Sequence, residues 1–196
     1  MSGIFIAVIT MLVLMPPLPR FALRDTAGVV HHEDEWSKSR AVVIFFTTID
    51  CPLSNSYVPE MNRIRTDYAN RSVAFYAVQT DTTIAAAEVR KHANEFGFSF
   101  PVLLDAKQVL VRLTGATATP EAAVLSGDGQ LLYLGRIDNR VVDFDKRRAA
   151  PTESDLRNAI DAVLAGRPVA RPKTDVVGCG INLVNPEKNQ GSDRRP

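Results

Sequence analysis

The clearest hydrophobic pattern in the chain is the uninterrupted apolar run over residues 41–46, within a predicted strand at 41–47. It shows no alternation of polar and apolar positions, which predicts a central strand buried on both faces. A helix is expected soon after it, because Pro52 suits the first helical position and apolar residues then recur at helical spacing. Pro59 falls within this helix and is expected to kink it. The recurring apolar residues are Val58, Met61, Ile64 and Tyr68.

A second strand and helix follow the same order. Residues 73–78 predict a strand, and Asp81 is expected to cap a helix over about 83–96. A short extended segment at 100–104 then leads into a helix capped by Asp105. The order βαβα implies parallel strands joined by right-handed crossovers.

Hairpins and a last helix complete the pattern. Residues 21–32 predict a β-hairpin that turns at Gly28, and residues 122–135 predict a second one. The last helix opens at Thr152, which is expected to form a capping-box-like pair with Asp155. The predicted fold class is therefore α/β, with a central mixed β-sheet flanked by helices.

Composition favours one domain with two appendages. The chain has 196 residues, of which 45% are hydrophobic, enough for one α/β domain with a sizeable core. The predicted divisions are an apolar segment at 1–16, the domain at 17–166 and a Pro/Gly-rich tail at 167–196. Lysine and arginine number 23 against 22 acidic residues, so no nucleic-acid partner is expected.

The apolar run at residues 4–15 has the length of a signal-peptide core and is short for a membrane span. No Lys or Arg precedes it, and no A-x-A-like cleavage site follows it. We expect an extracytoplasmic protein, with a cytoplasmic location as the alternative. Contact with a membrane is expected only if this segment is retained as an anchor.

The chain contains two cysteines, Cys51 and Cys179, which excludes a disulfide-dense framework and any zinc site built from four thiolates. Cys51 stands where the first strand ends and a helix begins. A helix N-terminus offers unpaired N–H groups and a positive dipole end, which favour the reactive thiolate. The alternative for each cysteine is a small buried hydrophobe.

The order of these elements resembles the thioredoxin fold over residues 17–166. Several short segments are similar to the redoxin, or alkyl hydroperoxide reductase and thiol-specific antioxidant (AhpC/TSA), branch of that superfamily in bacteria. Those segments are Phe45–Pro52, Pro59-Glu60, Phe100–Leu103, Thr119-Pro120-Glu121 and Gly135–Asp138. The resemblance implies that Pro120 is a cis-proline beside the reactive sulfur and leaves the backbone at Thr119 free to pair with an extended substrate. Otherwise Pro120 would follow an ordinary trans bond.

The chain departs from a thioredoxin at one position. A thioredoxin carries a second cysteine three residues after the first, and here that position is Ser54. Cys51 therefore has no local partner for a disulfide, although the Ser54 hydroxyl can donate a hydrogen bond to a thiolate.

The chain also departs from a peroxiredoxin. Ile44 stands where that family has a proline, whereas Thr48 matches its Thr or Ser position. The arginine of a peroxiredoxin would fall near Thr119-Pro120, and Arg136 on the following strand is a weak replacement. Efficient peroxide reduction is in question for this reason.

Cys179 is flanked by glycines in the tail, 179 − 51 = 128 residues after Cys51. Similar redoxin-domain proteins often end with such a Gly-Cys segment, so the resemblance implies a tail that folds back with a resolving cysteine. Pairing requires the two Cα atoms to come within about 7 Å, which the sequence permits but does not establish.

Our hypothesis from the sequence is a thiol oxidoreductase with Cys51 as nucleophile and Cys179 as resolving cysteine. Thr48 and the helix N-terminus would stabilise the thiolate, and Pro120 would shape the substrate groove. The expected partners are an external thiol reductant, thioredoxin-like or small, and a peroxide or protein disulfide substrate.

Two alternatives remain open at this point. One is a peroxiredoxin-like thiol peroxidase, and the other is a non-catalytic module in which a Cys51–Cys179 disulfide only fastens the tail. No cofactor and no metal ion is expected.

Overall fold

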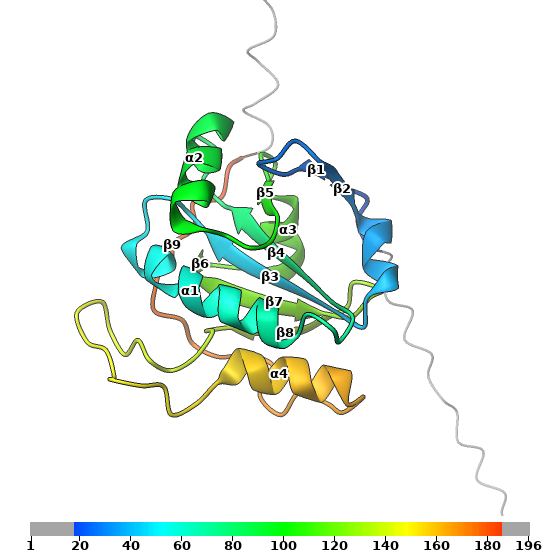
Figure 1. Ribbon diagram of the computed structural model, residues 1–196, viewed down its shortest axis with the longest axis vertical. Coiled ribbons are helices and arrows are strands. Elements are labelled where there is room, and N and C mark those ends of the chain that lie inside the picture. The colour runs from blue at the N-terminus through cyan, green and yellow to red at the C-terminus, as the bar shows by residue number, and fades with distance from the viewer. Residues whose placement is uncertain (1–17, 186–196) are drawn as a thin grey trace, which may run out of the picture.

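A five-stranded β-sheet in the order β5-β4-β3-β7-β8 forms the centre of the structure (Figure 1). The computed structural model describes residues 18–185. The central strand β3 is buried along its whole length, parallel to β4 and antiparallel to β7. At the edges, β5 is parallel to β4, and β8 is antiparallel to β7. The strands are β3 (Ala41–Thr47), β4 (Val73–Gln79), β5 (Val102–Leu104), β7 (Glu121–Leu125) and β8 (Leu131–Gly135).

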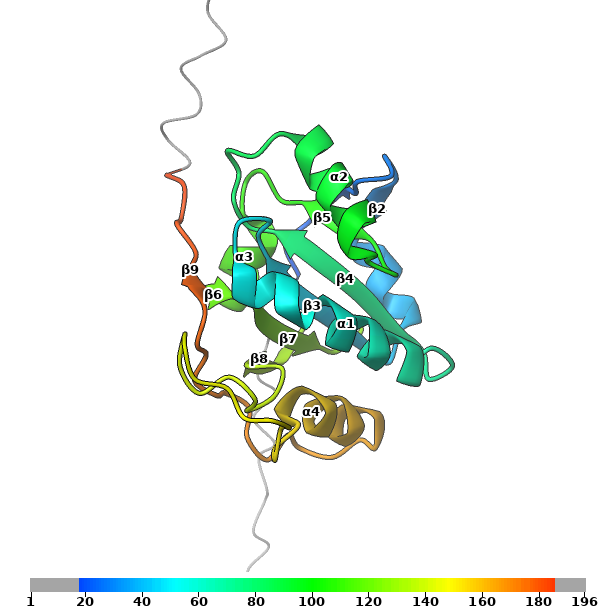
Figure 2. The same cartoon turned by 60° about the vertical axis from the view of Figure 1, so that its left-hand side comes forward.

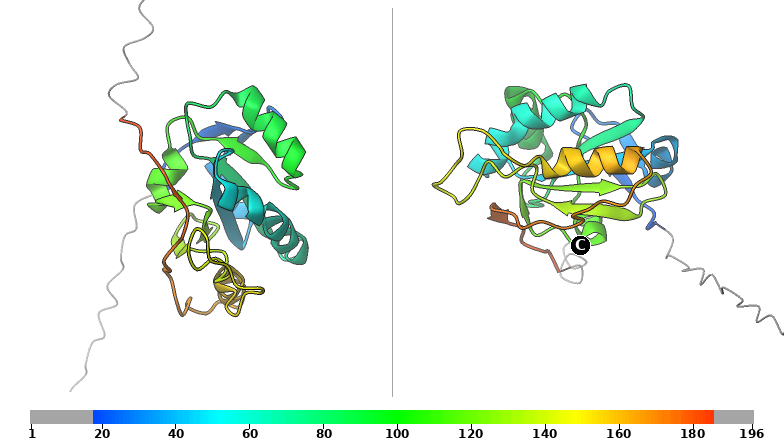
Figure 3. Two further views of the ribbon diagram at one scale, coloured as in Figure 1. Left: turned by 90° about the vertical axis from the view of Figure 1, so that its left-hand side faces the viewer. Right: turned by 90° about the horizontal axis from the view of Figure 1, so that it is seen from below.

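Helices cover both faces of this sheet, which confirms the predicted fold class. One core cluster joins α1, α2 and α4 to alternate residues of β3, and α4 lies across β7 and β8 (Figure 3). A second cluster on the opposite face contains residues of η1 and α3. The helices are η1 (Glu33–Lys38), α1 (Pro52–Asp67), α2 (Ala86–Phe96), α3 (Val109–Thr114) and α4 (Asp155–Leu164).

Both predicted hairpins are confirmed. Strands β1 (Ala22–Arg24) and β2 (Val30–His32) pair antiparallel. Gly28 has a φ of +94°, a left-handed conformation that glycine adopts without steric cost. Within the second hairpin, β7 and β8 are joined by the turn at residues 126–130.

The starts of two helices differ from the prediction. Helix α2 begins at Ala86 rather than near residue 83, because the carboxylate of Asp81 closes a local turn by accepting the N–H of Thr83 at 2.8 Å. The predicted capping box of α4 is wrong. Thr152 donates its N–H to the side chain of Asn139, and the helix begins only at Asp155. Side-chain bonds within loops have displaced both helix starts.

After α4 the chain runs along the outside of the domain and returns to the sheet (Figure 2). There β9 (Cys179–Gly180) pairs antiparallel with β6 (Ala118–Thr119), and the two strands form a small sheet separate from the central one. We call residues 172–184 the returning tail. The predicted apolar segment at 1–16 lies outside the described residues. Within residues 18–185, no helix combines the length and apolarity needed to cross a membrane.

Candidate active site

Cys51 lies at the N-terminal end of α1 and is completely buried. It is the N-cap residue, with extended backbone angles, and Pro52 begins the helix. The N–H of Ser54 donates to the Cys51 sulfur at 3.4 Å, and the thiol donates to the carbonyl of Thr119 at 3.1 Å. The end of β3 and the first turn of α1 thus place the sulfur against the segment before Pro120.

The returning tail brings Cys179 to the same place. Its Sγ lies 2.6 Å from the Sγ of Cys51, and both residues are free thiols in this structure. The register of β6 and β9 sets Cys179 opposite Thr119. At Gly178 the tail passes so close to Thr119 that an added Cβ would lie 2.4 Å from the carbonyl oxygen, so only glycine fits.

The two thiols have opposite acidities. Burial favours the neutral form of Cys51, but hydrogen bonding with Cys179, with Thr119 and with the N–H of Ser54 outweighs it and lowers the pKa of Cys51. Burial and the neighbouring Cys51 sulfur raise the pKa of Cys179 to about 11. Cys51 is therefore the more acidic thiol of the pair, and Cys179 holds its proton more tightly.

The segment around Pro120 supplies the opposite wall of the site. The Thr119-Pro120 bond is cis, as the resemblance implied. The buried carboxylate of Glu121 accepts the N–H groups of Thr117 at 2.7 Å and Ala118 at 3.2 Å. Glu121 thereby fixes the short strand that pairs with the tail. Sequence analysis gave it no role, although a glutamate opening an otherwise apolar strand was a usable signal.

Thr48 and Ser54 make other contacts than those expected. The Thr48 hydroxyl accepts a hydrogen bond from Gln79 at 3.3 Å, and its carbonyl accepts the N–H of Cys51. Ser54 reaches the sulfur through its backbone N–H, while its buried hydroxyl has no hydrogen-bond partner among residues 18–185. The thiolate contact expected from a Ser54 hydroxyl is thus made by the main chain instead.

The loop before Cys51 is held by a pair of side chains that sequence analysis missed. Asn55 donates to the carbonyl of Ile49 at 2.8 Å, and the ring Nε2 of His92 lies 2.9 Å from the Asn55 oxygen. Burial lowers the pKa of His92, so its neutral ring donates from Nε2 to that oxygen. These contacts join α2 to the first turn of α1.

A cavity of about 370 Å³ opens beside both sulfurs. Its lining is rich in hydroxyls and carboxylates. The side chain of Asp50 is exposed there, and Asp50 is not among the groups that shift the pKa of Cys51. Across residues 18–185 no group of three or more His, Cys, Asp or Glu side chains is arranged to hold a metal ion. The lining residues are Thr48, Asp50, Cys51, Thr80–Thr83, Cys179–Asn182 and Val184.

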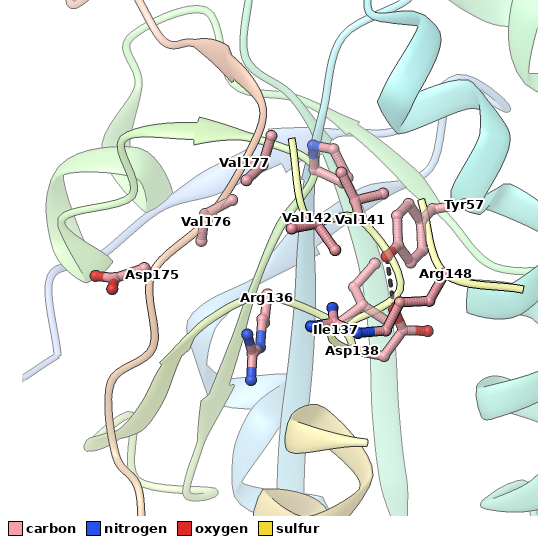
Figure 4. A pocket seen from close by; sticks show the side chains of 11 residues that line it. Tyr57, Arg136, Ile137, Asp138, Val141, Val142, Arg148, Asp175, Val176 and Val177 are labelled. Carbon is pink, nitrogen blue, oxygen red and sulfur yellow. Dashed lines mark hydrogen bonds between the residues drawn. The ribbon is translucent and has the colours of Figure 1, made fainter. Parts of the chain in front are cut away.

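A second cavity, of about 190 Å³, lies between α1, the loop after β8 and the tail (Figure 4). Pro120 lines it, and the Tyr57 hydroxyl donates to Asp138 at 2.6 Å. Arg136 also reaches this cavity, but its guanidinium forms ion pairs with Asp155 and Glu153. Arg136 is therefore already neutralised, which weakens it as a replacement for a peroxidase arginine.

The family model described as Redoxin matches residues 16–156. The chain belongs to the Redoxin family. This match covers the domain that carries Cys51 and Pro120 but ends before Cys179. The tail is thus a feature for which the structure, rather than the family match, provides the evidence.

Individual relatives agree with this family. The chain is similar to the thiol-disulfide oxidoreductase ResA of Bacillus thuringiensis (strain Al Hakam), with 26% identity over 115 residues. That match covers 58% of this chain and 64% of the relative's length.

The chain is also similar to proteins of known structure. A hypothetical protein from Sinorhizobium meliloti 1021 has a TM-score of 0.74 and 26% identity, covering 89% of this chain and 97% of the other. A thiol:disulfide interchange protein of the thioredoxin family from Chlorobium tepidum TLS has a TM-score of 0.57 and 17% identity, covering 76% and 95%. The second shows the shared fold alone.

Proposed function

We propose that this Redoxin-family protein is a thiol-disulfide oxidoreductase in which Cys51 attacks the substrate and Cys179 resolves the product. The observation that carries this proposal is the 2.6 Å contact between a Cys51 sulfur of lowered pKa and a Cys179 thiol of raised pKa. The similarity to a thiol-disulfide oxidoreductase supports the same class of chemistry.

The reaction has two exchange steps. The Cys51 thiolate attacks one sulfur of a substrate disulfide, forming a mixed disulfide and releasing the other substrate sulfur as a thiolate. The Cys179 thiolate then attacks the Cys51 sulfur, forming the Cys51–Cys179 disulfide and releasing the remaining substrate thiolate. An external thiol reductant, a thioredoxin-like protein or a small thiol, returns both cysteines to the reduced form.

The pKa values of Cys51 and Cys179 suit an order in which Cys51 reacts first and Cys179 second. Two of the causes that raise the pKa of Cys179 are its hydrogen bond to Cys51 and the Cys51 charge. Both disappear when Cys51 enters a mixed disulfide, because that sulfur is then neutral. The pKa of Cys179 is expected to fall at that moment, which makes it a better nucleophile when it is needed.

A disulfide is a better candidate substrate than a hydroperoxide. The backbone at Thr119 already pairs with an extended segment that carries a cysteine, which is the geometry a protein disulfide would present. Peroxide cleavage, in contrast, gains from a free cation at the sulfur, and Arg136 is held in ion pairs.

The test is to mix the reduced protein with a model disulfide and map its products by mass spectrometry without reduction. Wild type should end as the Cys51–Cys179 disulfide, Cys179→Ser should stop at a mixed disulfide on Cys51, and Cys51→Ser should not react faster than a free thiol. A parallel arm with hydrogen peroxide should give no faster reaction than a free thiol. Failure of wild type to form the internal disulfide would refute the proposal.

A purely structural disulfide is distinguished by its reduction potential. Structural disulfides have potentials below about −300 mV, whereas catalytic and labile ones are more oxidising. Equilibration of wild type in glutathione buffers should give a potential above that value for the Cys51–Cys179 couple. A reduction potential below that value would favour the alternative in which the disulfide only fastens the tail.

We also infer an extracytoplasmic location for this chemistry, supported by the apolar run at residues 4–15. Cell fractionation of the tagged full chain should recover the protein outside the cytoplasm. Recovery from the cytoplasmic fraction would contradict this inference without affecting the chemistry.

A further inference from the structure

The returning tail is held near the active site by the side chain of Gln108, a residue with no exposed surface. The amide nitrogen of Gln108 donates to the carbonyl of Thr80 at 3.0 Å and to that of Asn182 at 2.8 Å. Its amide oxygen accepts the N–H of Val184 at 2.8 Å. One buried side chain thus connects the end of β4 to two backbone groups of the tail.

This contact resembles pairing between strands. The amide of Gln108 binds the C=O of one tail residue and the N–H of the next but one, as a backbone peptide group would. Gln108 itself has a left-handed φ of +52°, an uncommon conformation for a residue other than glycine. The surrounding structure therefore determines its position strongly.

The tail is fixed on both sides of Cys179. Before it, Gly178 lies against the carbonyl of Thr119. After it, the N–H of Ile181 donates to Thr117 at 2.9 Å, and the contacts of Gln108 follow. Cys179 is therefore held from two directions, and the bound tail lies over a Cys51 that is fully buried.

We propose that Gln108 is a positioning residue for the resolving step. It aligns the tail so that the Cys179 sulfur stands at Cys51, and the aligned tail also shields Cys51 from reagents in solution. This inference rests on the proposed function. Gln108 acts through Cys179 and touches neither reacting sulfur.

The proposal predicts opposite effects on the two exchange steps. Loosening the tail lowers the effective concentration of Cys179 at Cys51, which slows resolution. The same loosening exposes Cys51, which leaves the first step equally fast or faster. A general loss of packing would not slow the second step selectively.

The experiment uses 5,5′-dithiobis(2-nitrobenzoate), because each step releases one coloured thionitrobenzoate. The Cys51 thiolate releases the first by forming a mixed disulfide, and the Cys179 thiolate releases the second by forming the internal disulfide. In Gln108→Leu the second release should slow by about tenfold or more, with the first unchanged or faster. Gln130→Leu, an exposed glutamine in the β7–β8 turn, is the matched control and should leave both rates unchanged.

Gly178→Ala provides a second route to the same result, because its added Cβ cannot sit against Thr119 and the change lies outside the domain core. It should also slow the second release selectively. In a Cys179→Ser background, either variant should release only one thionitrobenzoate, at least as fast as Cys179→Ser alone. A second-release rate equal to wild type in Gln108→Leu would overturn the inference, whatever the rate of Gly178→Ala. A wild type that releases only one thionitrobenzoate would instead overturn the proposed function.

Discussion

The acidity of Cys51 depends on contacts from three parts of the chain. The N–H of Ser54 is local and comes with the first turn of α1. Thr119, whose carbonyl accepts the Cys51 thiol, and Cys179, whose thiol donates to the Cys51 sulfur, are 68 and 128 residues away, and they reach the sulfur only because the sheet and the tail bring them there. These contacts overcome the effect of burial, which alone would keep the thiol neutral.

The pH dependence of Cys51 alkylation tests this account. Only the thiolate reacts, so the rate rises with pH and is half-maximal at the pKa. Wild type should reach half its maximal rate below the value of about 8.5 for a free cysteine. Cys179→Ala removes a donor to the thiolate, so its midpoint should move to higher pH.

Ser54→Ala is the matched control for that measurement. Its backbone N–H still donates to the sulfur, and its lost hydroxyl had no partner, so the alkylation midpoint should stay at the wild-type value. An equal shift in both variants would show that the Cys179 contact is not the cause.

Helix α1 carries Cys51, and its orientation is fixed by contacts further along the helix. Met61 and Ile64 bury their side chains in the core cluster that includes alternate residues of β3, as their spacing predicted. Tyr57 adds a polar contact, because its hydroxyl donates to Asp138 while the guanidinium of Arg140 lies 4.5 Å from its ring centre. Burial, together with Asp138, raises the pKa of Tyr57 and keeps this hydroxyl a donor.

Two substitutions at Tyr57 separate these contributions. Tyr57→Phe removes only the hydrogen bond and should lower the free energy of unfolding by about 1–2 kcal/mol, since Asp138 keeps the N–H of Arg140. Tyr57→Leu also removes the ring and its cation–π contact and should cost about 1–2 kcal/mol more. Urea denaturation monitored by circular dichroism measures both. Equal losses in the two variants would contradict a separate role for the ring.

The elements were predicted more reliably than their ends. The predicted order of strands and helices was confirmed, because it follows from hydrophobic periodicity and glycine turns, whereas η1 and β6 were not predicted. Asp105 accepts the N–H groups of Val109 and Leu110 in the first turn of α3, as a capping side chain would, although Gln108 holds the N-cap position. The predicted start of α4 was wrong, because Asn139 binds Thr152 and keeps it out of the helix.

The returning tail links the last part of the described chain to the first helix. Its docking depends on backbone contacts with β6, Gln108 and Leu134 rather than on a hydrophobic stripe of its own. Such contacts leave little trace in a single sequence. A disulfide between Cys51 and Cys179 would hold the tail in this docked position for as long as the bond is oxidised.

Oxidation should therefore stabilise the whole molecule. A disulfide closing the 179 − 51 = 128 residue interval reduces the entropy of the unfolded chain, which in the loop-entropy estimate stabilises the fold by up to about 5 kcal/mol. Guanidinium unfolding of oxidised and reduced wild type should differ by up to this amount. Cys179→Ala should unfold identically under both conditions, and a redox-dependent difference in that variant would exclude the internal bond as its cause.

The sequence by itself determined the α/β layout, the strand-to-helix position of Cys51 and the absence of a neighbouring second thiol at Ser54. These features are local, since strand, turn and capping patterns act over a few residues. The meeting of Cys51 with Cys179 and the parts of Gln108 and Glu121 were decided only by the tertiary structure. They depend on backbone and buried amide contacts between segments far apart in sequence, whose energies are set by distance and burial rather than by any periodic pattern.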